Sequence, residues 1–173
     1  MRNARGPSRS CETSHALTKG TRTMSRYMMI MRSTPEAEAA LAEQDIDFDE
    51  IIAEMGRYNE ELIKAGVMVA GEGLTDPEEG FVVDFGTDDP TVTDGPYPTA
   101  RFDGFWIIDV PSKDEAKKWA AKCPLGTGVT LEVRRIADVE EFPQDNEWVQ
   151  REIQWRVELA EKAAADARAV AAR

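Results

Sequence analysis

Asp94 is the residue whose surroundings in the sequence best suit chemistry. It precedes Gly95 and Pro96 in a turn-forming stretch that leads into an almost wholly apolar segment, residues 104–110. A carboxylate fixed beside a buried sheet loses part of its hydration and can then exchange a proton near neutral pH. The common alternative for Asp before Gly-Pro is a hydrogen bond to the backbone of its own turn. Asp94 is therefore the first candidate catalytic residue.

Glu72 is the second candidate. It stands between Gly71 and Gly73, directly after the apolar residues 67–70. Glycine allows another group to approach the backbone closely, which suits a ligand site. A glutamate in a loop is more commonly only solvated. If the protein is an enzyme, we predict that Asp94 and Glu72 carry its acid/base chemistry.

Five further side chains suit the binding of a small organic molecule. Tyr97 and Trp106 can stack on a flat ligand, although aromatic residues in a sheet usually belong to the core or to an interface. Arg101 can clamp a carboxylate, or it is a solvated loop residue. Glu132 and Arg134 alternate along one stretch and so share a face, where they hold a polar ligand or form cross-strand ion pairs.

The sequence contains no motif for a cofactor or a metal ion. It has no glycine-rich phosphate loop and no nucleophile elbow, and residues 24–173 contain no Cys/His pair. The single histidine is His15, near the N-terminus. A metal site would need carboxylates such as Asp94, Glu72, Asp103 and Asp109 to converge, which favours only weak binding of a hard cation. We expect neither a cofactor nor a metal.

The charge of the chain is unevenly distributed. The 173 residues carry a formal net charge of −12. Residues 1–23 hold five basic residues and one acidic residue, a net charge of +4, so the rest of the chain carries −16. An acidic body repels nucleic acids and anionic membrane surfaces, and no stretch approaches the ~20 apolar residues of a membrane span. With only two widely spaced cysteines, the sequence predicts a soluble, cytoplasmic protein without nucleic-acid or membrane partners.

The apolar pattern predicts the order strand, helix, strand, strand, helix, strand. The four strands are residues 27–31, 67–70, 104–110 and 129–134. Of the two helices, residues 45–65 carry apolar side chains every three or four positions, and residues 112–123 begin with a capping box at Ser112 and Glu115. Short strands at residues 81–85 and 91–93 flank a turn-prone segment and predict a hairpin inserted before the third main strand.

This order is that of the ferredoxin-like βαββαβ fold, an α+β fold with an antiparallel sheet and both helices on one face. The first three main strands lack polar alternation, so their second face must also be covered, most simply by the same sheet of a second subunit. We therefore predict a homodimer. Residues 24–138 form the domain, residues 1–23 a disordered N-terminal extension. Residues 139–173 form a C-terminal helical extension, with two tryptophans that require a covering surface.

Several of these segments together resemble the YCII-related family, in particular its DGPF-motif branch. The likeness covers about residues 24–138 and rests on short sequence steps: Asp94-Gly95-Pro96, Gly71-Glu72, residues 104–110, and Glu132-Val133-Arg134. The resemblance implies a dimeric α/β barrel. It also implies relatives that act on small aromatic or lactone-like compounds through a His–Asp pair. The chain departs from that pattern because residues 24–173 contain no histidine and because Tyr97 stands where the branch usually has Phe.

Two hypotheses of function follow. The first is a homodimeric YCII-like protein with a small-molecule pocket, using cofactor-independent acid/base chemistry of the isomerase or lyase type on a small organic compound. The alternative is a non-enzymatic accessory or regulatory protein, because the resemblance implies genetic neighbours that are extracytoplasmic-function sigma factors. In that case the C-terminal helix, from residue 144, is the docking element, whereas the reading we favour is that this helix packs on its own dimer.

Overall fold

Four antiparallel strands form the main sheet of the computed structural model, which describes residues 24–34, 37, 39, 48–96 and 101–171. The strand order is β2-β5-β1-β6. The strands are β1 (Ser25–Arg32), β2 (Met68–Gly73), β5 (Gly104–Val110) and β6 (Thr130–Arg135). With β1 central and paired to β5 and β6, this order confirms the predicted ferredoxin-like topology.

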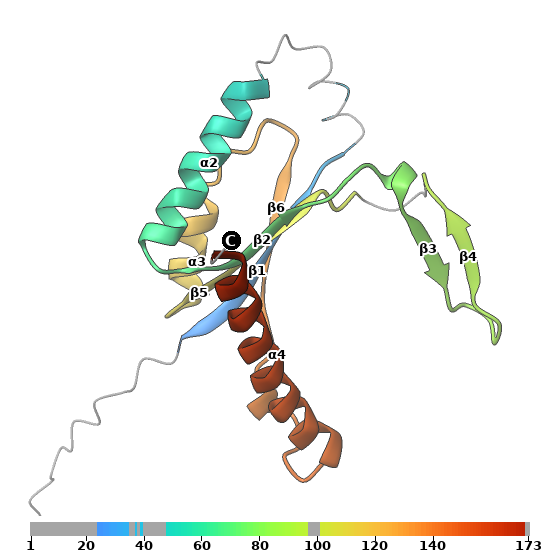
Figure 1. Cartoon of the computed structure of the whole chain (residues 1–173). Coiled ribbons are helices and arrows are strands. Elements are labelled where there is room, and N and C mark those ends of the chain that lie inside the picture. The colour runs from blue at the N-terminus through green and yellow to red at the C-terminus, as the bar shows by residue number, and fades with distance from the viewer. Residues whose placement is uncertain (1–23, 35–36, 38, 40–47, 97–100, 172–173) are drawn as a thin grey trace, which may run out of the picture.

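Two helices lie on one face of this sheet (Figure 1). They are α2 (Phe48–Lys64) and α3 (Lys113–Ala120). The Ser112 side chain accepts a hydrogen bond from the Glu115 amide at 3.1 Å, which satisfies one of the amides left open at the start of α3. Both helices were predicted, but α3 ends three residues earlier than expected.

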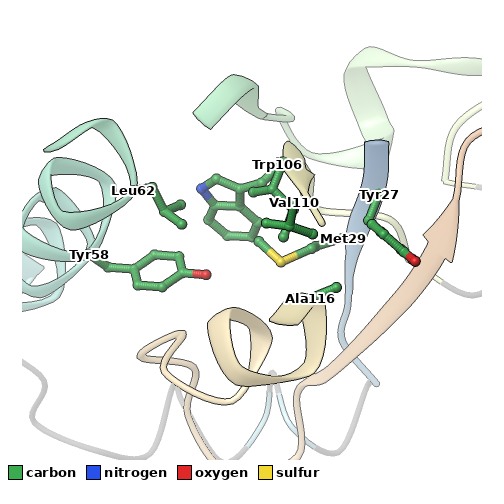
Figure 2. Close-up of a cluster of buried hydrophobic side chains, with 8 residues drawn as sticks. Tyr27, Met29, Tyr58, Leu62, Trp106, Val110 and Ala116 are labelled. Carbon is green, nitrogen blue, oxygen red and sulfur yellow. The ribbon is translucent and has the colours of Figure 1, made fainter. Parts of the chain in front are cut away.

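The core fills the space between the helices and the sheet (Figure 2). Its fully buried side chains come from both layers: Met29, Leu62, Ile108 and Val110. The Trp106 indole donates a hydrogen bond to Asn59 Oδ1 at 2.9 Å, and its ring lies nearly perpendicular to that of Tyr58, at a centroid distance of 6.1 Å. Each large apolar side chain buried here contributes about 1.5–3 kcal/mol. The core therefore fixes α2 against β5.

Tyr58 also joins the two helices. Its hydroxyl donates to the Trp119 carbonyl at 3.0 Å, at the end of α3. Burial, followed by the neighbouring Cys123, raises the pKa of the Tyr58 phenol well above its ordinary value. Burial likewise raises the pKa of the Cys123 thiol to about 11. Both groups are thus held in their neutral forms at this corner of the core.

The opposite face of the main sheet carries an apolar band with no helix packed on it among the described elements. Strand alternation places Met28 and Ile30 of β1 there, next to Ile107 and Phe105 of β5. The Phe102 ring lies beside that of Phe105, at a centroid distance of 6.2 Å. Met28, Phe105 and Ile107 remain partly exposed. The predicted lack of polar alternation is confirmed for β1 and β5, and we call this surface the open face.

The inserted hairpin forms a small sheet of its own. Strands β3 (Phe81–Asp84) and β4 (Thr91–Asp94) pair only with each other among the described strands, and they project away from the main sheet (Figure 1). A 3-10 turn, η1 (Pro77–Glu79), leads into β3. The hairpin was predicted at nearly these residues.

Strand β2 is longer than predicted, because residues 71–73 continue it instead of beginning a loop. Gly71, Glu72 and Gly73 pair with β5, and the ladder shifts register between Met68 and Ala70. Such a shift is a β-bulge, and it leaves Val69 52% exposed.

After β6 the chain forms a second 3-10 turn, η2 (Val139–Glu141), and then the long helix α4 (Glu147–Ala171). No residue of α4 is buried in the described structure. Trp148 and Trp155 are both exposed, and their rings lie 6.5 Å apart between centroids. The helical extension was predicted. The predicted disordered extension, residues 1–23, lies outside the described residues.

Candidate functional site

Asp94 is the last residue of β4, where it lies opposite Phe81 and is exposed. The next residue, Gly95, is packed against η1. Its amide donates to the Gly80 carbonyl at 2.9 Å, and a Cβ atom at this position would lie 1.7 Å from the Pro77 carbonyl oxygen. The Asp-Gly-Pro step therefore closes the hairpin onto η1, and it needs glycine for that contact.

Arg101 lies at the same end of the molecule. Its Nη2 donates to Asp76 Oδ1 at 3.0 Å, and its Nε donates to Asp103 Oδ1 at 2.8 Å. Asp76 precedes η1 and Asp103 precedes β5, so Arg101 ties the hairpin base to the main sheet. Arg101 and Gly95, the neighbour of Asp94, thus lie against η1 or the residue that precedes it. Tyr97 lies outside the described residues.

Glu72, Glu132 and Arg134 share the open face. Glu72 and Glu132 end a row that crosses all four strands, with Phe105 and Ile30 between them. Glu132 accepts a hydrogen bond from Arg32 Nε at 2.8 Å, and Arg134 Nε lies 3.9 Å from its other carboxylate oxygen. Glu132 therefore takes part in a cross-strand ion pair.

Trp106 lies on the other side of the sheet, in the core, 7% exposed. Its side chain and that of Glu72 are on opposite faces, so they do not border one site. The structure divides the sequence candidates into a group beside η1, a group on the open face and one core residue.

Asp109 is a polar group of the open face that the sequence suggested only as a possible metal ligand. Its Oδ1 atom is buried and has no hydrogen-bond partner in the described part of the chain. It is paired in register with Arg26 of β1, on the same face as Ile107. The signal in the sequence was a single acidic residue in an otherwise apolar strand.

A cavity of about 350 Å³ opens on the helix side of the sheet, between α3 and β6. It is lined by residues of β1, α3 and β6: Tyr27, Lys113, Ala116, Lys117, Val133 and Arg135. None of the candidates chosen from the sequence is among them. The sequence did contain one signal for this cavity. Arg135 follows Leu131 and Val133 at the positions of β6 that face the helices, and it is charged where they are apolar.

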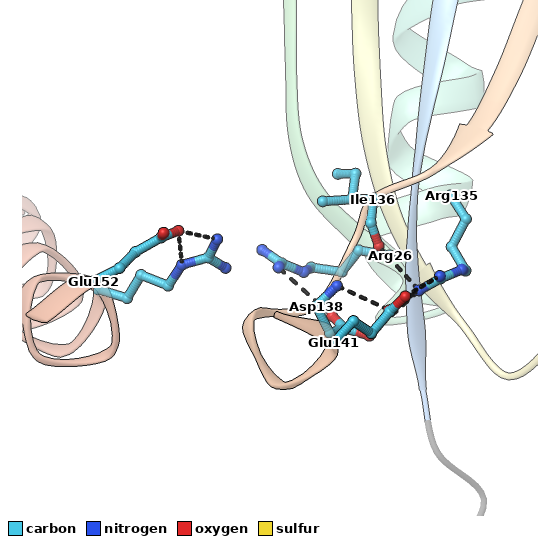
Figure 3. Close-up of polar contacts among 7 residues, drawn as sticks. Arg26, Arg135, Ile136, Asp138, Glu141 and Glu152 are labelled. Atoms are coloured by element: carbon cyan, nitrogen blue, oxygen red, sulfur yellow. Dashed lines mark hydrogen bonds and ion pairs between the residues drawn. The ribbon is translucent and has the colours of Figure 1, made fainter. Parts of the chain in front are cut away.

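Arg135 is held from the side of η2 (Figure 3). Its guanidinium makes two hydrogen bonds to Glu141, one of them from Nη2 at 2.6 Å, and Glu141 also accepts from the Asp138 amide at 3.1 Å. The hydrogen bond from Arg135 lowers the pKa of Glu141 to about 2, and Glu141 in turn raises the pKa of Arg135. This pairing fixes one wall of the cavity.

Nothing in the described residues brings three or more His, Cys, Asp or Glu side chains together as metal ligands. Within the same residues, no helix has the length and hydrophobicity that crossing a lipid bilayer requires.

Comparison with curated proteins finds no match. The family model of the YCII-related domain matches residues 25–140, which is more than half of the chain. That match includes every strand of the main sheet, α2, α3 and the hairpin, and it ends at η2. The chain therefore belongs to the YCII-related family.

Proposed function

We propose that this YCII-related protein works as a homodimer joined through the open faces of its two sheets, and that it acts on a small organic compound by acid/base chemistry without a cofactor. The observation that carries the proposal is the apolar band on the open face. Met28, Ile30, Phe105 and Ile107 form adjacent pairs on the two central strands, and Met28, Phe105 and Ile107 remain partly exposed.

Burial of this band would supply the driving force, at roughly 25 cal/mol for each Å² of apolar surface removed from water. A twofold axis through the band would set each open face against an identical one.

Acid/base chemistry is proposed for Glu72 and Asp94. Glu72 is exposed on the edge strand beside Phe105, at the rim of the proposed interface, and Asp94 is exposed at the hairpin base. A carboxylate in either position can remove a proton next to a carbonyl group and return it elsewhere, which is the step common to isomerases and lyases. Arg101, beside the same turn, would attract the negative charge that develops.

Sedimentation equilibrium tests the dimer. Ile107→Lys puts a charge into the apolar band and should convert a dimeric protein into a monomer. Ile63→Lys is the matched control, because Ile63 is 63% exposed on the outer side of α2, and that variant should remain a dimer. A wild-type protein that is monomeric at every concentration would refute the proposal, as would an Ile107→Lys variant with normal circular dichroism that still dimerises.

Hydrogen exchange of small compounds tests the chemistry. In D₂O, a proton-abstracting enzyme replaces substrate C–H groups with deuterium, which proton NMR detects for a panel of small aromatic and lactone compounds. We expect Glu72→Gln or Asp94→Asn to slow exchange by roughly 100-fold or more. Exchange at the wild-type rate in both variants would exclude these carboxylates, and a panel without any exchange would argue against the enzymatic function.

The alternative function, an accessory protein of an extracytoplasmic-function sigma factor system, is favoured by the bare aromatic surface of α4. Trp148 and Trp155 are 58% and 46% exposed, which suits a docking surface. Replacing both by Ala separates two roles of this helix. Loss of dimer mass would mean that α4 packs within the dimer, whereas an intact dimer that no longer binds the purified sigma factor would support docking.

A further inference from the structure

The cavity between α3 and β6 has the opposite charge from the body of the protein. The chain has 33 acidic and 21 basic residues. Yet three of the six described residues that line the cavity are basic and none is acidic. Lys113 and Lys117 are four residues apart on α3 and so lie on one side of that helix, while Arg135 faces them from β6. This arrangement places three cations around a concave surface, while the carboxylates that pair with Lys117 and Arg135 are not among the described lining residues: Asp114, Asp138 and Glu141.

The other half of the lining is mostly apolar. Ala116 is 1% exposed and Tyr27 is 7% exposed, and Val133 pairs with Met29 on the helix-facing side of the sheet. Figure 2 shows the Tyr27 ring directed away from the Trp106 end of the core, toward β6. The cavity therefore has an apolar floor and a basic rim, and its volume of about 350 Å³ lies at the lower end of the range for small-molecule pockets.

The ion pairs of the rim leave it able to bind an anion. Lys117 pairs with Asp114 at 2.9 Å, but the two side chains are 66% and 81% exposed, so water screens the pair and a ligand can compete for the lysine. Arg135 is held firmly by Glu141, which positions its guanidinium. Its guanidinium makes two hydrogen bonds to Glu141 and one to the Ile136 carbonyl, and Nη1 also lies 3.7 Å from Asp138 Oδ2. These hydrogen bonds do not exhaust its five donors.

We propose that this cavity binds a small organic carboxylate, whose charged group contacts Lys113, Lys117 and Arg135 and whose apolar body rests on Ala116, Val133 and the Tyr27 ring. The site lies on the helix side of the sheet, opposite the open face. It is therefore independent of the dimer interface and of the acid/base residues proposed above.

NMR titration of amide-labelled protein with benzoate tests this site. We expect saturable shifts at the amides of Ala116 and Val133. Benzamide, which has the same shape without the charge, should bind at least about tenfold more weakly, because it lacks the charge-assisted contacts. Inorganic phosphate should also bind more weakly, because it has no apolar body to cover the floor.

Two neighbouring lysines provide the matched variants. Lys117→Gln removes a lining cation and should weaken benzoate binding about tenfold. Lys118→Gln removes the same charge from the same helix, together with an equivalent ion pair to Glu115 at 2.9 Å, but Lys118 is not among the lining residues. The affinity of the Lys118→Gln variant for benzoate should stay within about twofold of that of the wild type.

Three results would overturn the proposal: no saturable shift up to about 10 mM benzoate, equal weakening by the two lysine variants, or phosphate binding as tightly as benzoate. A melting temperature unchanged in both variants shows that the comparison concerns binding and not folding.

Discussion

At the scale of single residues, Gly95 determines how the Asp94-Gly95-Pro96 step packs against η1. The sequence directed attention to Asp94 but placed it in a turn after a strand at residues 91–93, whereas it is the last residue of β4. The sequence alone could not reveal which segment packs against this step, because Pro77 of η1, which touches the backbone of Gly95, lies 18 residues earlier in the chain. The contact leaves no room for a side chain, whereas the carboxylate beside it is exposed.

Gly95→Ala should therefore destabilise the protein. A Cβ atom would lie 1.7 Å from the Pro77 carbonyl oxygen, so the hairpin must move away from η1, at a cost of about 1–3 kcal/mol in the free energy of unfolding. Gly73→Ala is the control, since no atom lies within 4 Å of the Cβ position there. Urea unfolding measures both, and equal stability of the two variants would contradict the packing role of Gly95.

The Cys123 thiol should be unreactive near neutral pH. Burial raises its pKa to about 11, so at pH 8 roughly one thiol in a thousand is ionised, compared with about a quarter for a free cysteine. In a Cys11→Ser background we expect an aromatic disulfide reagent to react with the folded protein about 100-fold more slowly than with the urea-unfolded protein. Equal rates in the two states would show that the thiol is not protected.

At the scale of elements, periodicity and turn residues predicted the strands, helices and hairpin almost completely. The main error was at Glu72, where flanking glycines indicated a loop, but pairing with β5 continues the strand through all three residues. Tertiary contacts can override such local preferences. The face of Trp106 and the cavity around Arg135 could not be predicted either, because both depend on which strands become neighbours.

The start of α3 offers a test at this scale. The Ser112 hydroxyl caps the helix, so Ser112→Ala should lower the free energy of unfolding by about 1 kcal/mol. Ser112→Asp retains an acceptor and should remain close to the wild type. Urea denaturation distinguishes the two, and an Ala variant as stable as the Asp variant would show that the cap contributes nothing.

At the scale of the whole molecule, the two faces of the sheet differ in what covers them. The helix side holds the chain's own core and, between α3 and β6, a cavity, whereas the open face presents an apolar band to its surroundings. The helix side could be predicted from the helix pattern, and the apolar nature of the open face from the missing alternation. The partner for that face stays a prediction.

A homodimer through the open face predicts that thermal stability depends on protein concentration. Because dimerisation stabilises only the folded state, the melting temperature of the wild type should rise by a few degrees over a hundredfold increase in concentration. The melting temperature of Ile107→Lys should be independent of concentration. Differential scanning calorimetry measures both, and a constant wild-type value would contradict the dimer.

The bulge in β2 has a consequence for the behaviour of the protein at high concentration. The two outermost strands of the sheet are β2 and β6, and their free hydrogen-bonding groups could recruit strands from other molecules. In β2 the bulge at Val69 interrupts the regular row of hydrogen-bonding groups. In β6 three of four consecutive residues are charged: Glu132, Arg134 and Arg135. Both borders thus resist the addition of a further strand. If the proposed homodimer forms through the open face, association would therefore end at two copies, because the edges of the sheet do not favour growth into fibres.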